Sequence, residues 1–414
     1  MRKRIVVTGL GAITPLGNDV PTYWDSLLKG VSGAATIQRF DASKFKTTFA
    51  CEVKDFDPTL YIDKKEARRM DPFCQYALAA ADQAVVDSKI NFSATDLNRV
   101  AVVMGSGIGG LQTFYEEVKS FVEGNGVPRF NPFFIPKMII DIVPGHISIK
   151  YGLKGPNFSS IAACATSTNC IIDGYLLIQS GLADVVLAGG SEAAVTQPGI
   201  GGFNAMKALS ERNDDPKTAS RPFDLDRDGF VLGEGGGCLI LEDLEYALSR
   251  GANIYAELVG IGMTADAYHI TAPAPDGNGA SRVMQTTLDY AKLPYTAIDY
   301  INVHGTSTPL GDIAETNSIK AVFKEHAAVL NISSTKSMTG HLLGAAGAIE
   351  AIATILAVKN DIVPPTINHF TDDPECDLNY TFHIPQQRTV NAAISNTFGF
   401  GGHNASLLFK KFIE

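Results

Sequence analysis

Short apolar runs that alternate with helical patterns are the feature that most constrains the fold of this chain. The runs are four or five residues long, as buried strands often are, and lie at residues 5–8, 100–104, 185–188, 238–241, 300–303 and 392–395. Helical spacing of apolar residues lies between them, most clearly at 71–88, 164–180 and 349–358. This alternation predicts an α/β protein.

The chain is expected to form two interlocked halves, residues 1–252 and 253–414, within one compact unit. Its 414 residues are 45% hydrophobic, enough to bury a large core, and no Pro/Ser-rich or highly charged linker separates the halves. In each half, a strand leads to a distinctive residue, Cys164 or His304, and a later strand ends in glycines. This faint similarity between the two halves suggests that one arose by duplication of the other.

Charge and cysteine usage exclude several classes of function. The net charge of −10 argues against general nucleic-acid binding. The six cysteines are scattered without a Cys-x-x-Cys pair, so we expect no metal site and no disulfide framework. Charged or polar residues interrupt every apolar run before it reaches membrane-spanning length. We therefore expect a cytoplasmic protein that binds neither membrane nor nucleic acid.

Cys164, in Ser-Ile-Ala-Ala-Cys-Ala-Thr-Ser, is the candidate nucleophile. We expect it to follow a strand and to open the helix at 164–180. The positive end of that helix would stabilise a thiolate, and free backbone N–H groups there bind an oxyanion. The alternative is a small buried core residue. Thr166 and Ser167 beside it are unusually polar for pure core.

Two histidines lie in loops rich in glycine: His304 in Val-His-Gly-Thr-Ser-Thr-Pro and His341 in Thr-Gly-His-Leu-Leu-Gly. Each is expected where a strand gives way to a loop. A neutral imidazole can donate an N–H to a developing enolate oxygen. Two such donors on one thioester carbonyl could stabilise the enolate formed when a β-carboxylate leaves as carbon dioxide. The alternative is a loop histidine whose hydrogen bonds are already satisfied.

Lys336 lies in Ser-Ser-Thr-Lys-Ser-Met-Thr-Gly-His, a stretch too uncharged for an ordinary solvated surface. A partly buried lysine needs a charged partner, and Glu350 on the following helix is the best candidate. Such a pair would orient the histidines and tune their protonation without touching substrate.

The segment Asn396-Thr-Phe-Gly-Phe-Gly-Gly-His-Asn-Ala combines dense glycine with apolar side chains. Its glycines would let the backbone approach a ligand closely or move. One interpretation is an oxyanion-binding N–H at Phe400, with its ring gating a pocket. The other is a tight turn between core strands, and the sequence does not choose between them.

Together these contexts resemble the β-ketoacyl-[acyl-carrier-protein] synthases, the elongating condensing enzymes of fatty-acid synthesis, which have the thiolase fold. The resemblance runs end to end through Ala-Cys164-Ala-Thr, Arg221-Pro-Phe-Asp, Gly233-Glu-Gly, His304-Gly-Thr-Ser-Thr, Lys336-Ser-Met-Thr-Gly-His341 and Asn396-Thr-Phe-Gly-Phe-Gly-Gly-His-Asn. The Cys–His–His set separates this branch from initiating synthases and chalcone synthases, which use Cys–His–Asn. The resemblance implies a five-layer αβαβα sandwich of two similar halves and a homodimer.

The resemblance also implies a division of catalytic work. Cys164 takes the acyl chain, with the backbone N–H groups of Cys164 and Phe400 as the oxyanion hole. His304 and His341 hold the malonyl thioester carbonyl while carbon dioxide leaves, and the lysine–glutamate pair organises both histidines. No cofactor is implied, because the substrates are carried on the phosphopantetheine arm of acyl carrier protein.

Further assignments concern substrate and partner. Thr306 and Thr308 resemble the family's contacts to the pantetheine arm, and Gly399 belongs to the substrate-binding set. Ile108 resembles the residue that lines the acyl pocket in type II synthases, where the type I branch tends to have glycine. A basic surface for docking acidic carrier protein is implied at Lys65, Arg68, Arg69, Arg129 and Lys207.

The main alternative functions lie within the same superfamily. A polyketide ketosynthase subunit or a type I elongating synthase would share these motifs. A non-catalytic chain-length-factor subunit typically lacks the nucleophilic cysteine, so Cys164 argues against it.

Overall fold

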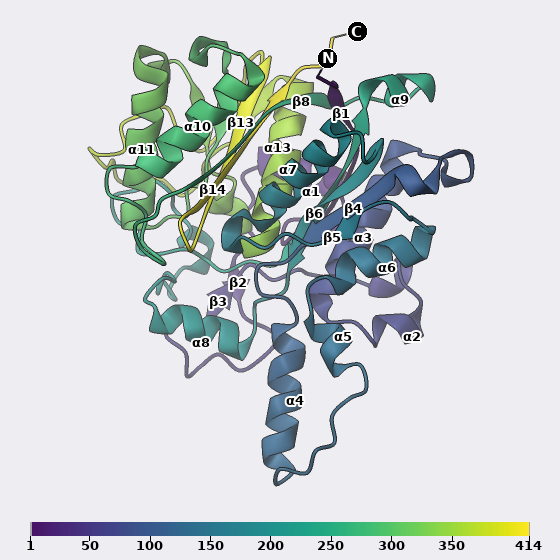
Figure 1. The fold of residues 1–414 in the computed structure, drawn as a ribbon. Coiled ribbons are helices and arrows are strands. Elements are labelled where there is room, and N and C mark those ends of the chain that lie inside the picture. Colours follow the sequence, from purple (N-terminus) through teal and green to yellow (C-terminus); the bar gives the residue numbers. More distant parts are fainter. Residues whose placement is uncertain (1, 414) are drawn as a thin grey trace.

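Ten strands form one hydrogen-bonded sheet in the computed structural model, which describes residues 2–413 (Figure 1). All six apolar runs predicted as strands lie in it, which confirms the α/β class. From one edge to the other, the strands are β10 (Asn331–Ser333), β9 (Tyr300–Asn302), β13 (Ala392–Gly399), β14 (His403–Lys410), β8 (Ala256–Ala265), β1 (Ile5–Ile13), β7 (Gly235–Asp243), β6 (Val185–Glu192), β4 (Val100–Gly105) and β5 (Asn157–Phe158).

The two halves of this sheet repeat one topology. In the first half β4 runs parallel to β5 and β6, and β7 lies antiparallel between β6 and β1. In the second half β9 runs parallel to β10 and β13, and β14 lies antiparallel between β13 and β8. The halves join where Val6 and Val7 of β1 pair with β8. The chain is therefore built from two similar halves, although the division after residue 252 stays a prediction.

Helices fill the space between the halves and cover their outer faces (Figure 1). Between the halves, α7 (Thr166–Gln179) packs on β4, β6 and β14, and α13 (Ala346–Asn360) packs on β13 and β7. Outside them, α3 (Pro72–Ser88) covers β1 and β7, and α10 (Asn278–Ala291) covers β8 and β14. This order of helix, sheet, helix, sheet, helix is the expected five-layer sandwich.

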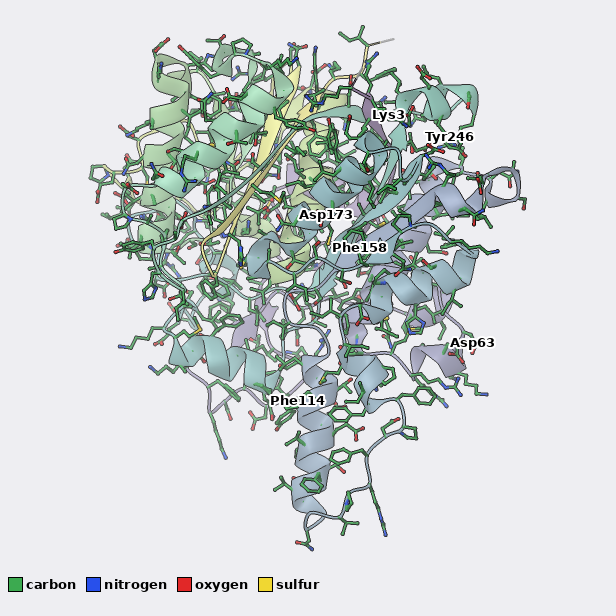
Figure 2. All side chains as sticks on the ribbon, in the orientation of Figure 1. Lys3, Asp63, Phe114, Phe158, Asp173 and Tyr246 are labelled. Carbon is green, nitrogen blue, oxygen red and sulfur yellow. The ribbon has the colours of Figure 1, made fainter. Side chains whose placement is uncertain are left out.

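The remaining elements lie around these layers. The helices are α1 (Val20–Leu28), α2 (Lys64–Ala67), α4 (Leu111–Glu123), α5 (Phe134–Met138), α6 (Ile142–Tyr151), α8 (Gln197–Ala205), α9 (Leu244–Ser249), α11 (Pro309–Phe323) and α12 (Lys336–Thr339). Two small two-stranded sheets pair β2 (Ala35–Thr36) with β3 (Phe49–Ala50), and β11 (Ile362–Val363) with β12 (Gln386–Gln387). Helix α4 projects away from the sheet (Figure 1), and the exposed ring of Phe114 lies on it (Figure 2).

One expectation about apolar segments was wrong. The stretch Leu343–Asn360, which contains α13, is long and apolar enough to cross a membrane by length and composition. Glu350 lies within this stretch, and its carboxylate is paired with Lys336 inside the protein. Since 89% of the stretch is buried between the sheet halves, it is a core helix of this fold.

Candidate active site

Cys164 lies in a tight turn between the sheet halves rather than on the helix itself. The turn spans Ala163–Ala165, and α7 begins at Thr166, so the prediction that Cys164 opens the helix was wrong by two residues. Ala163 has a φ of 47°, a left-handed conformation that alanine rarely adopts and that tertiary packing must enforce. The thiol is buried, with the residue 7% exposed, and forms no disulfide.

The hairpin between β13 and β14 closes on this turn. The backbone N–H groups of Phe400 and of Cys164 itself both lower the pKa of the Cys164 thiol, that is, they favour its thiolate form. A Cβ on Gly399 would lie 2.8 Å from the Ala162 carbonyl oxygen and 3.1 Å from the Cys164 nitrogen. Only glycine therefore allows the hairpin to approach so closely.

Burial controls the protonation of the Cys164 sulfur. It raises the pKa of the Cys164 thiol to about 12, although the Lys336 charge and the Phe400 N–H both favour the thiolate. The resting group at neutral pH is consequently the thiol, and the sulfur would have to lose its proton to act as a nucleophile.

The two histidines enter the same space from the second half. His304 follows β9, as predicted, whereas His341 follows the short helix α12 instead of a strand. The backbone of His341 is fixed by bonds from its N–H to the Val231 carbonyl (2.7 Å) and from the Gly233 N–H to its own carbonyl (2.9 Å). The two imidazole ring centres lie 5.3 Å apart, and the rings are nearly perpendicular.

A buried ion pair lies behind the histidines. Lys336 and Glu350 are each 1% exposed, and their side chains form the predicted pair. Burial raises the pKa of Glu350 to about 7, an effect that the ammonium opposes. Burial and then the Lys336 charge hold the pKa of both His304 and His341 well below the ordinary value. Both imidazoles are therefore neutral at physiological pH.

Sequence reasoning missed a carboxylate that supports His304. Glu315 of α11 accepts hydrogen bonds from the backbone N–H groups of His304 (3.0 Å) and Gly305 (2.8 Å), and burial raises its pKa to about 7. An acidic residue on a helix ordinarily faces solvent, so no sequence signal marked Glu315 as buried.

A cavity of about 630 Å³ joins these groups. The predicted residues that line it come from both halves of the fold: Ile108, Cys164, Lys207, His304, Thr306, Thr308, His341, Gly399 and Phe400. The Thr306 and Thr308 hydroxyls lie 3.0 Å apart at its wall. Lys336 and Glu350 do not line the cavity, in keeping with the expectation that they act without touching substrate.

The predicted docking residues do not form a single cluster in this chain. Lys65 and Arg68 are exposed on and just after α2, and Arg129 is exposed on the loop that follows α4. Arg69 is half-buried, paired with Glu66. Lys207 follows α8 at the cavity, and α2 and α8 lie on opposite sides of α4 (Figure 1). Only Lys207 therefore lies at the cavity itself.

Comparison with known proteins agrees with this geometry. Residues 2–247 match the family described as "Beta-ketoacyl synthase, N-terminal domain", and residues 255–370 match the corresponding C-terminal domain. The chain belongs to the β-ketoacyl synthase family. It is 51% identical to 3-oxoacyl-[acyl-carrier-protein] synthase 2 of Synechocystis sp. and 52% identical to the protein of that name from Staphylococcus aureus strain COL, with 99% of each chain covered.

Solved structures show the same relationship. The ishigamide ketosynthase/chain length factor has a TM-score of 0.93 at 34% identity, with full coverage of both chains. A β-ketoacyl synthase from Burkholderia phymatum has a TM-score of 0.92 at 34% identity, covering 99% of this chain and all of the other. The fold is thus that of the thiolase-like ketosynthases, and the synthase is a condensing enzyme of the acyltransferase class.

Proposed function

We propose that this synthase elongates fatty acids by two carbons, through decarboxylative condensation of malonyl-carrier protein with an acyl chain held on Cys164. The observation that carries the proposal is one cavity in which a buried thiol, two backbone N–H donors and two neutral imidazoles converge. Identity of 51–52% to proteins named 3-oxoacyl-[acyl-carrier-protein] synthase 2 supports the type II branch.

Acyl transfer comes first. The Cys164 sulfur attacks the thioester carbon of acyl-carrier protein, and the oxyanion accepts hydrogen bonds from the N–H groups of Cys164 and Phe400. The bond from the acyl carbon to the pantetheine sulfur then breaks. The proton from the cysteine thiol goes to that departing sulfur, which leaves an acyl thioester on the enzyme and a free carrier thiol.

Condensation follows in the same cavity. His304 and His341 donate hydrogen bonds to the thioester oxygen of the malonyl group. The bond to the carboxylate carbon breaks, carbon dioxide leaves, and the electron pair forms an enolate that the two donors stabilise. The enolate carbon attacks the acyl carbonyl, the carbon–sulfur bond to Cys164 breaks, and a 3-oxoacyl-carrier protein forms. The Cys164 thiolate takes up one proton from solvent, which restores the thiol.

The surrounding residues have supporting roles. Burial and then the Lys336 charge keep both histidines neutral, and the Lys336–Glu350 pair keeps them oriented. Thr306 and Thr308 hold the pantetheine arm, and Ile108 lies against the acyl chain. The reaction as written transfers no electrons to an acceptor and needs no cofactor beyond the carrier's own arm.

The partners are an acyl carrier protein and a second copy of this chain. A type II PKS acyl-carrier protein has been solved in complex with its ketosynthase, which matches this chain at a TM-score of 0.91 and 32% identity. Strand β5 leaves one edge of the sheet open, with Phe158 37% exposed (Figure 2) and Ile161 58% exposed nearby. Pairing of two such edges would give a homodimer in which basic residues of both chains receive the carrier. A cytoplasmic location fits this role.

Mass spectrometry tests the proposal directly. The protein is mixed with a panel of acyl-carrier proteins and then with malonyl-carrier protein. An adduct on Cys164 followed by a product two carbons longer supports fatty-acid elongation. Turnover restricted to 3-oxoacyl donors would favour a polyketide role, and no adduct from any donor would overturn the proposal.

A further inference from the structure

Glu192, the last residue of β6, is fully buried beside the active-site cavity without lining it. Its Oε1 accepts hydrogen bonds from the Ser106 hydroxyl (2.8 Å) and the Ile108 N–H (3.2 Å). Its Oε2 accepts from the N–H groups of Gly107 (2.8 Å) and Gly344 (3.0 Å). A carboxylate offers about four acceptor sites, so every one is used.

Gly344, one of the residues that Glu192 binds, occupies the same place in the second half as Cys164 does in the first. Gly344 is the central residue of the turn Leu343–Ala345, which precedes α13 just as the Cys164 turn precedes α7. Both turns begin with a residue at a φ of 47°. Gly344 is therefore the counterpart of Cys164 in the second half. Its N–H, equivalent to an oxyanion-hole donor, is occupied by the carboxylate of Glu192.

The Glu192 carboxylate also leaves no room for a side chain at Gly107 or Gly344. A Cβ on Gly107 would lie 2.7 Å from Glu192 Oε2, and a Cβ on Gly344 would lie 2.8 Å from the same atom. The Cβ on Gly344 would also lie 2.2 Å from the Gly107 nitrogen. The loop that carries Ile108 and the turn that follows His341 are thus packed directly around one carboxylate.

We propose that Glu192 is a positioning residue that sets acyl-chain selectivity, by holding Ile108 against the cavity and tying it to the turn that follows His341. This inference rests on the proposed function, because it takes Ile108 as part of the acyl-binding wall. Glu192 binds the backbone of Ile108 and of Gly344 at once, so the wall and the histidine loop are held in one fixed arrangement.

Substitution Glu192→Gln tests the proposal with little change in shape. The glutamine carbonyl can keep the Gly107 and Gly344 N–H groups, while its NH₂ donates to Ser106. The Ile108 N–H then loses its acceptor. Without this hydrogen bond, Ile108 can move away from the cavity and leave more room for a long acyl chain. The kcat/KM for palmitoyl-carrier protein, divided by that for hexanoyl-carrier protein, should therefore rise about threefold to tenfold. This is the size of effect expected for one lost hydrogen bond.

The matched control is Glu242→Gln. Glu242 is also fully buried and hydrogen-bonded, but to Thr8 and Arg250 at the far end of the sheet from the cavity. Its substitution should leave the ratio unchanged. A rise in the ratio for Glu192→Gln alone supports the proposal. An unchanged ratio in a folded Glu192→Gln protein, or equal changes in both variants, would overturn it.

A second readout does not depend on condensation. The Glu192 charge adds to the burial that raises the pKa of Cys164, so its removal should shift the pH profile of iodoacetamide alkylation to lower pH. Ser106→Ala keeps that charge and removes one donor, so it should shift the chain-length ratio less and the alkylation profile not at all. If Glu192→Gln does not fold, Glu192→Asp takes its place, because the shorter side chain withdraws the carboxylate from the Ile108 N–H; an unchanged ratio in a folded Glu192→Asp protein overturns the proposal. Wild-type protein that forms no 3-oxoacyl product refutes the proposed function instead.

Discussion

Substitution Gly399→Ala would test whether the close approach of the hairpin creates the oxyanion site. The added methyl group would lie 2.8 Å from the Ala162 carbonyl oxygen, 3.1 Å from the Cys164 nitrogen and 3.2 Å from the Ala165 nitrogen. All three are backbone atoms of the nucleophile turn, so no side chain can rotate away. The hairpin must retreat by about 0.5 Å to reach an ordinary contact distance.

That retreat lengthens the hydrogen bond from the Phe400 N–H to the sulfur site. Loss of one oxyanion donor typically lowers kcat by about a hundredfold to a thousandfold. Because Gly399→Ala would displace the Phe400 N–H only partly, its effect should lie at the lower end of this range. We therefore expect acylation of Cys164 to slow about a hundredfold. The rate of appearance of the acyl-enzyme, followed by intact-mass spectrometry in a single turnover, measures this step alone.

Gly145→Ala is the matched control. Gly145 lies within α6, and a Cβ there would have no heavy atom within 4 Å. Alanine should stabilise this helical position by about 0.5–1 kcal/mol and leave acylation unchanged. Calorimetry of both variants separates loss of the fold from loss of the site. A folded Gly399→Ala protein that acylates at the wild-type rate would refute the steric argument.

Three further predictions follow from the site. Cys164→Ala should abolish acyl transfer and keep the native circular dichroism spectrum; retained condensation would exclude the thioester mechanism. Lys336→Met should raise the pKa of His304 and His341, so the acidic limb of the pH–rate profile moves to higher pH. Breaking that buried ion pair should also lower the free energy of unfolding, measured with urea, by about 3–5 kcal/mol. Ile108→Phe should shorten the longest chain accepted, and an unchanged product distribution would remove Ile108 from the acyl pocket.

The sequence predicted the strands well for a physical reason. Strands in the interior of this sheet are buried on both faces, so each appears as a continuous apolar run rather than an alternating one. The turn at Cys164 and the short helix α12 before His341 were not predicted. Their backbone conformations, such as the positive φ of Ala163, are imposed by packing against the other half and leave no local signal.

The site was only partly predictable. Cys164 and the histidines stand out because reactive side chains in glycine-rich loops are unusual, and Lys336 stands out because its neighbours are uncharged. Glu192 and Glu315 have no such context. Each lies in an ordinary strand or helix, and only the structure shows that it is buried among backbone N–H groups.

Duplication of the fold places Gly344 in the second half where the first half has Cys164. The turns before α7 and α13 have the same conformation and pack against each other in the central layer. The second turn carries Gly344, where any Cβ would collide with the Gly107 nitrogen and with Glu192. A cysteine placed there would displace the loop of the first half before it could react. The packing around Gly344 thus leaves no room for a second sulfur, and the second half contributes His304 and His341 to the cavity instead.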